Sequence, residues 1–87
     1  MIKAWTDRAW EEYEAWQNED RKTLRRINAL LKDIEANGCL KGIGKPEALK
    51  YDWQGWYSRR IDEQNRLIYR INEYGALEIA QCKTHYE

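Results

Sequence analysis

The 87-residue sequence contains no phenylalanine, one proline, one histidine and two cysteines. A single histidine excludes a metal site built on several imidazoles. Cys39 and Cys82 are too few for a disulfide framework and too far apart along the chain to suggest a zinc site. We therefore expect reduced thiols, and neither a metal nor another cofactor.

Long apolar runs are also lacking, since uninterrupted stretches such as 29–31 and 67–69 are short. A membrane-spanning helix needs about 20 apolar residues, and the opening MIKAWTDRAW has no apolar core of the signal-peptide kind. We expect no membrane contact, no export by that route and a cytoplasmic location. The length suits one compact domain over residues 1–87.

Neither sign of charge dominates, because 15 basic and 15 acidic residues give a formal net charge of zero. Acidic residues prevail before residue 21 and after residue 70, whereas residues 21–70 are basic overall. A neutral total argues against indiscriminate nucleic-acid binding, but a basic middle can form one phosphate-binding face. Five tryptophans and six tyrosines suit half-buried positions and base stacking equally well.

Two adjacent helices are predicted in the first half of the chain, after a brief strand over residues 1–5. Thr6 is an acceptable N-cap for a helix over residues 7–19. A second helix over residues 21–37 ends at Gly38, a residue typical of the C′ position. Its apolar seam has helical spacing and consists of Leu24, Ile27, Leu31 and Ile34.

The second half of the chain predicts strands. Residues 38–49 hold three glycines and the proline and are expected to form a loop. Three runs rich in β-formers, 56–61, 67–71 and 77–84, are separated by short polar turns, which indicates an antiparallel meander. The predicted fold is α+β, with both helices on the sheet face that bears Leu67, Tyr69 and Ile71.

Few residues could carry chemistry, because the sequence has no Gly-rich phosphate loop and Ser58 lies outside any nucleophile-elbow pattern. A lone histidine in a small domain is usually structural or simply exposed. His85, however, follows the last predicted strand, where it would be accessible, and histidine has an unperturbed pKa of about 6.5. It is therefore also a candidate proton donor or acceptor.

Glu47 and Arg66 have two interpretations each. Glu47, in the segment KPEALK, is either a solvated loop carboxylate or a general base between two lysines that attract phosphate. Arg66 alternates with Ile68 and Arg70 on one face of a predicted strand. Such an arginine is most often solvated, but its guanidinium is also well shaped to hold a phosphate through two parallel hydrogen bonds.

The segments GIGKPEALK, GWYSRRIDEQNRLIYRI and CKTHY, together with MIKAWTDRAWEEYEAW and INALLKDIEANG, resemble the YoeB/Txe family of bacterial toxins, within the RelE/ParE superfamily. The similarity extends from Met1 to Tyr86. It implies a type II toxin: an endoribonuclease that cuts messenger RNA in the ribosomal A site without metal, by attack of the ribose 2′-hydroxyl on the adjacent phosphate.

The resemblance also implies a role for each matching residue. Glu47 would be the general base, His85 the general acid and Arg66 the stabiliser of the phosphorane charge, while Tyr86 would orient the scissile nucleotide. The residues expected to hold the messenger backbone or ribosomal RNA are basic: Lys45, Lys50, Arg59 and Arg60.

The implied partners are a cognate antitoxin, the ribosome and messenger RNA, with operator DNA reached only through the antitoxin complex and a homodimer possible. Two alternatives from other classes stay open. One is a non-catalytic binding module with the same fold, as in the gyrase-directed ParE branch, which is not expected to keep Glu47, Arg66 and the His85–Tyr86 end. The other is a degenerate toxin that acts only as an antitoxin-binding co-repressor.

Overall fold

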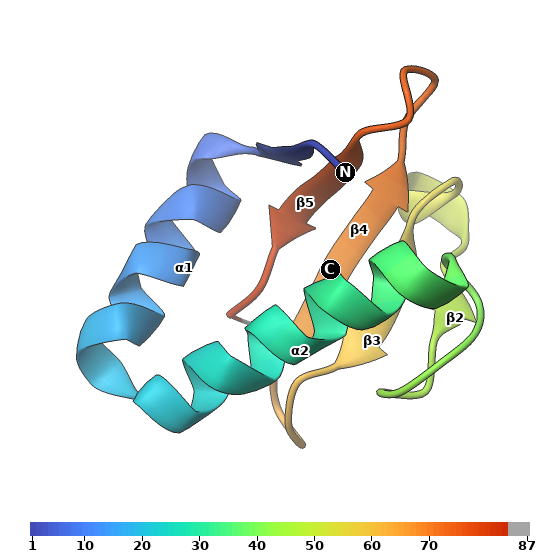
Figure 1. The fold of residues 1–87 in the computed structure, drawn as a ribbon. Helices are drawn as coiled ribbons and strands as arrows, with labels where there is room; N and C mark the ends of the chain where they lie inside the picture. The colour runs from blue at the N-terminus through green and yellow to red at the C-terminus, as the bar shows by residue number, and fades with distance from the viewer. Residues whose placement is uncertain (84–87) are drawn as a thin grey trace.

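The computed structural model describes residues 1–83, in which five strands form one mixed sheet with two helices packed against it (Figure 1). In chain order the elements are β1 (Lys3–Trp5), α1 (Asp7–Glu19), α2 (Arg21–Asn37), β2 (Glu47–Ala48), the short 3₁₀ helix η1 (Tyr51–Trp53), β3 (Tyr57–Arg60), β4 (Arg66–Ile71) and β5 (Leu77–Gln81). The spatial order is β1-β5-β4-β3-β2, with β1 parallel to β5 and the other pairs antiparallel. The α+β prediction and the antiparallel meander are confirmed.

Local capping sets the helix bounds, which agree with the predicted 7–19 and 21–37. The Thr6 hydroxyl accepts a hydrogen bond from the Ala9 amide at 3.0 Å and so caps α1. Asp20 ends α1 and also caps α2, because its carboxylate accepts the amides of Lys22 and Thr23. The hydrogen bond from the Thr23 hydroxyl is the largest of several contacts that lower the pKa of Asp20.

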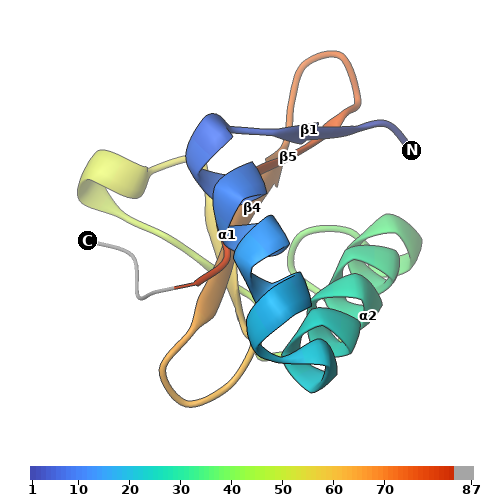
Figure 2. The same cartoon turned by 90° about the vertical axis from the view of Figure 1, so that its left-hand side faces the viewer.

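Both helices cover the same face of the sheet, as predicted, and the main core lies between them and the strands (Figure 2). Leu67 and Tyr69 of β4 are fully buried in this core. Ile71 was expected beside them but is 37% exposed. It is the last residue of β4 and is followed after Asn72 by the exposed residues 73–75, so it lies at the edge of the core.

A smaller core occupies the opposite face, where the segment after β2 folds over the sheet (Figure 2). Leu49, Ile68 and Ala80 are buried there, with Trp53 and Trp56 packed against them at right angles to each other. The sequence prediction of a plain loop over residues 38–49 is therefore incomplete. Residues 47–48 form the edge strand β2, which only its pairing with β3 reveals.

The last described strand ends at Gln81 and not at residue 84, and residues 84–87 lie outside the described part of the chain. Within residues 1–83, neither helix is long and apolar enough to cross a membrane.

Cys82 is held by its own amide, which donates to Glu12 at 2.7 Å, and by its carbonyl, which accepts from the Trp16 indole at 2.9 Å. Burial, with the Glu12 carboxylate nearby, raises the pKa of the Cys82 thiol to about 12, so it is neutral at physiological pH.

Candidate functional site

The sheet register places several of the predicted site residues on the face opposite α1 and α2. Glu47 lies opposite Ser58, which lies opposite Ile68 of β4. Arg60 and Arg66 also pair with each other. Each lies two residues from the pair Ser58–Ile68 along its strand, so both side chains are on this same face. With strands about 4.8 Å apart and a rise of about 3.3 Å per residue, the Cα atoms of Glu47 and Arg66 are roughly 12 Å apart.

Glu47 is exposed on the edge strand β2, and one carboxylate oxygen faces the Ser58 hydroxyl at 3.5 Å. A shallow pocket of about 320 Å³ adjoins it, lined by residues 47–51. Lys45 and Lys50 flank this segment in the chain, and both are exposed. The structure thus offers an accessible carboxylate on a segment that also carries two exposed cations, which suits a proton acceptor beside a phosphate.

Arg66 is half-buried and fixed to the turn between β3 and β4. Its Nη1 donates to the carbonyls of Asp62 at 2.7 Å and Asn65 at 3.1 Å. The Asp62 carboxylate orders the turn by accepting the amides of Gln64 and Asn65. Partial burial acts to raise the pKa of Asp62, but the hydrogen bonds from Asn65 and Gln64 outweigh it and hold that pKa below its usual range.

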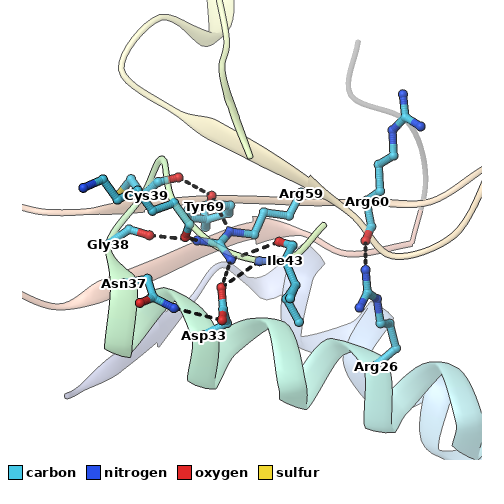
Figure 3. A network of polar contacts seen from close by, with 10 residues as sticks. Arg26, Asp33, Asn37, Gly38, Cys39, Ile43, Arg59, Arg60 and Tyr69 are labelled. Carbon is cyan, nitrogen blue, oxygen red and sulfur yellow. Dashed lines mark hydrogen bonds and ion pairs between the residues drawn. The ribbon is translucent and has the colours of Figure 1, made fainter. Parts of the chain in front are cut away.

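Arg60 brings a second arginine to the same site. Its side chain is exposed, and its carbonyl accepts a hydrogen bond from Arg26 of α2 at 3.2 Å (Figure 3). Like charges that face each other across two strands are destabilising unless an anion lies between them. The pair Arg60–Arg66 therefore marks this end of the sheet as suited to bind an anion such as a phosphodiester.

Arg59 does not belong to this surface, which corrects the sequence prediction that it contacts RNA. Its side chain is fully buried on the helix side of the sheet, where it forms an ion pair with Asp33 of α2 (Figure 3). The reason lies in the strand itself, because consecutive residues point to opposite faces. Only one of the two adjacent arginines can be at the site, and it is Arg60.

His85 and Tyr86 lie outside the described residues, so their roles stay predictions. Strand β5 ends at Gln81, which pairs with Ile68 of β4. Ile68 lies two residues from Arg66 along the same strand. Beyond Gln81, Lys83 forms an ion pair with Glu19 at 2.6 Å. Among residues 1–83 no group of three or more His, Cys, Asp or Glu side chains is arranged to hold a metal ion.

Comparison with known proteins places this chain in a family. A family model described as the YoeB-like toxin of bacterial type II toxin–antitoxin systems matches residues 5–86. The chain belongs to this YoeB-like toxin family. The resemblance seen in the sequence is thereby confirmed over nearly the whole chain.

Curated relatives and solved structures of the YoeB-like family agree. Toxin YoeB of Streptomyces coelicolor is 46% identical and that of Escherichia coli K12 is 40% identical, each over 99% of this chain and 100% of the relative. The YoeB–YefM heterotetramer of Staphylococcus aureus has a chain that is 44% identical, with a TM-score of 0.92 and coverage of 99% and 98%. The YoeB/ParE toxin of Agrobacterium tumefaciens is 39% identical, with a TM-score of 0.93 and coverage of 99% and 100%.

Three polar residues on the site face of this YoeB-like chain, Ser58, Arg70 and Gln81, were not predicted to belong to the site. Ser58 and Gln81 are each only 1% exposed, and the Gln81 amide nitrogen has no hydrogen-bond partner within the described residues. Arg70 stacks on Trp56 at 4.3 Å and contacts Glu78 at 3.3 Å. The alternation Arg66, Ile68, Arg70 was a usable signal for Arg70, but no sequence pattern marks a buried serine or glutamine.

Proposed function

We propose that this chain is a ribosome-dependent endoribonuclease that cleaves messenger RNA in the ribosomal A site and thereby inhibits translation. The observation that carries the proposal is the joint position of Glu47, Arg60 and Arg66 on the sheet face opposite α1 and α2, in a chain of a toxin family. The accessible Glu47 carboxylate provides a proton acceptor, and the paired residues Arg60 and Arg66 provide an anion-binding site within reach of the same nucleotide.

The proposed reaction is an in-line transfer at phosphorus. Glu47 accepts the proton of the ribose 2′-hydroxyl, whose oxygen forms a bond to the adjacent phosphorus. Arg66 stabilises the negative charge that develops on the phosphorane oxygens. The bond to the 5′-oxygen breaks, His85 donates a proton to that oxygen, and Tyr86 holds the scissile nucleotide in line. The products are a 2′,3′-cyclic phosphate and a 5′-hydroxyl.

Binding to RNA is proposed to depend on the exposed cations near the site, Lys45, Lys50 and Arg60. Contacts of this kind neutralise phosphates and release counterions, so they contribute affinity with little base preference. Arg59 takes no part, because its guanidinium is buried. The ribosome supplies the remaining binding surface, and the proposed place of action is the cytoplasm.

A cognate antitoxin is the proposed regulator. Structures of Staphylococcus aureus YoeB include complexes with YefM and a YoeB dimer. By analogy, this chain would bind an antitoxin that covers the basic face with an acidic segment, would reach operator DNA only through that complex, and could form a homodimer. Adding the antitoxin at near-stoichiometric ratio should abolish cleavage, and activity that persists at saturating antitoxin would contradict this part of the proposal.

The deciding experiment is cleavage of a defined messenger by the purified chain, with and without programmed ribosomes. We expect cuts only on the ribosome and fragments with a free 5′-hydroxyl. A 5′-phosphate would show that water is the nucleophile and would overturn the roles of Glu47 and His85. Tight antitoxin binding without any cleavage on ribosomes would instead favour the non-catalytic co-repressor.

A further inference from the structure

All five donor positions of the Arg59 guanidinium are used inside the protein (Figure 3). Its Nε donates to the Tyr69 hydroxyl at 2.9 Å, and its Nη1 donates to the Asp33 carboxylate and to the Ile43 carbonyl at 3.1 Å. Its Nη2 donates to the carbonyls of Gly38 at 2.8 Å and Lys41 at 2.7 Å. No donor remains for a ligand, so the group acts within the fold.

Three of these five acceptors are backbone carbonyls of one segment, residues 38–44, which contains neither helix nor strand. The partners of Arg59 hold the same segment. Asp33 accepts the Ile43 amide at 3.0 Å, and the Tyr69 hydroxyl donates to the Cys39 carbonyl at 2.7 Å. One guanidinium thus supplies the hydrogen-bond donors for three carbonyls of this segment. The side chains of Arg59, Asp33 and Tyr69 are called the clamp below.

The clamped segment leads directly to Glu47, with only Lys45 and Pro46 between them. The strand β2 that bears Glu47 is two residues long, and within residues 1–83 it pairs only with Ser58 and Tyr57. So short a strand cannot fix its own position, and its anchors are the clamp on one side and Leu49 on the other. Leu49 is buried, and its amide donates to the Trp56 carbonyl at 2.9 Å.

The clamp and the Glu47 contact are carried by adjacent residues of the same strand. Arg59 of β3 points towards α2 and holds the segment that precedes Glu47, while Ser58 points to the opposite face and contacts the Glu47 carboxylate. The next amide along, that of Arg60, donates to the Gly44 carbonyl at 2.7 Å. The geometry therefore links α2, the segment 38–44 and the Glu47 carboxylate through three consecutive residues of β3.

We infer that Arg59, through its ion pair with Asp33, is a positioning residue that sets the place of the Glu47 carboxylate on the site face. The inference rests on the proposed function for the catalytic role of Glu47. Its structural content, that the clamp holds β2 in register with β3, does not depend on that function. A misplacement of a catalytic group by about 1 Å can cost about 10²-fold in rate, which gives the expected size of the effect.

Two variants and a control test the inference. Arg59→Lys keeps the charge but cannot reach five acceptors, and Tyr69→Phe keeps the ring in the core but removes the hydroxyl that bridges Arg59 and Cys39. Ile27→Val alters the packing of α2 in the core without removing a polar group of the clamp. We expect Arg59→Lys to slow single-turnover cleavage on the ribosome by about 10²-fold, Tyr69→Phe to slow it less, and ribosome binding to be kept in both.

A second comparison separates positioning from a loss of stability. In a Glu47→Ala background, Arg59→Lys should cause little further loss of rate, because it acts through the missing carboxylate. Amide hydrogen exchange at residues 47–49 should be faster in Arg59→Lys and Tyr69→Phe than in Ile27→Val when all are compared at the same global stability. If Arg59→Lys does not fold, Tyr69→Phe gives the same readouts.

The possible failures are distinguishable. If Glu47→Ala cleaves at the wild-type rate, the proposed function of Glu47 is wrong, whatever the clamp does. If Glu47→Ala is slow but the clamp variants cleave like Ile27→Val, the positioning role is overturned while the proposed function stands. Additive rate losses in the double variant, or unchanged amide exchange at residues 47–49, would also overturn it.

Discussion

Arg60 of β3 and Arg66 of β4 lie directly opposite each other on the sheet face away from α1 and α2. Neither guanidinium has a carboxylate partner among the ion pairs of the described residues. This contrasts with Arg59, whose neighbouring position on the same strand is buried against Asp33. The adjacent residues Arg59 and Arg60 thus have different tasks. Arg59 stabilises the fold, whereas Arg60 faces solvent beside the candidate site.

The first prediction separates the role of Arg66 from that of a nearby arginine on the same strand face. Arg66→Ala should slow single-turnover cleavage by about 10²–10³-fold, because the guanidinium stabilises the negative charge that develops in the transition state. Arg70→Ala is the matched control, since Arg70 stacks on Trp56 and contacts Glu78. Single-turnover rates on programmed ribosomes give the measurement, and equal losses in both variants would contradict the assignment of Arg66.

His85→Ala should slow the same reaction by about 10²–10⁴-fold, the usual range for the loss of acid–base catalysis. Because a general acid must be protonated, the wild-type rate should fall as the pH rises above the pKa of His85. The variant should lose that alkaline decline. A rate–pH profile from about pH 5 to 9 tests this, and an unchanged alkaline limb in His85→Ala would refute the role.

The salt dependence of ribosome affinity should distinguish the exposed basic residues near the site from the buried Arg59. Replacing Lys45, Lys50 or Arg60 by alanine should weaken binding to programmed ribosomes. Each change should also reduce the slope of log affinity against log salt by roughly 0.7–0.9, the value for one phosphate contact. Arg59→Lys should leave this slope unchanged, because its guanidinium is buried. Binding titrations over a range of salt concentrations measure both quantities, and a slope change only in Arg59→Lys would reverse the assignment.

Acid should weaken the clamp through Asp33. The hydrogen bond from Arg59 is the largest cause that holds the pKa of Asp33 below its usual range. A carboxylate with a lowered pKa in the folded state stabilises the fold above its unfolded pKa of about 4, and this contribution is lost as the pH falls towards the folded value. Thermal unfolding of the wild type should therefore move to lower temperature over this range.

The variant Asp33→Asn provides the comparison for the acid effect. It should be less stable than the wild type at neutral pH, because it leaves the buried Arg59 charge without its partner. Its melting temperature should then depend less on pH between about 5 and 2, because the titrating group is gone. Parallel curves of melting temperature against pH for the two proteins would show that Asp33 does not contribute to acid unfolding.

The site was only partly predictable from sequence, and Arg59 shows why. The segment SRRI was expected to present both arginines to RNA, although the alternation of side chains in a strand already requires that the two point to opposite faces. Which of the two arginines faces the core depends on how β3 packs against α2, because Asp33 of α2 forms an ion pair with the Arg59 guanidinium. Residue-level patterns do not specify that contact, because Asp33 and Arg59 are distant in the chain.

The sequence by itself determined the helix bounds, the strand order of the meander and the family, because caps, apolar periodicity and turns are local features and the motifs are contiguous. Only the tertiary structure decided that Glu47 lies on a two-residue edge strand opposite Ser58, and that Ile68 is covered by the segment after β2. Both features arise from pairing and packing between residues far apart in the chain. Such contacts form only when the whole sheet is assembled, so no local pattern encodes them.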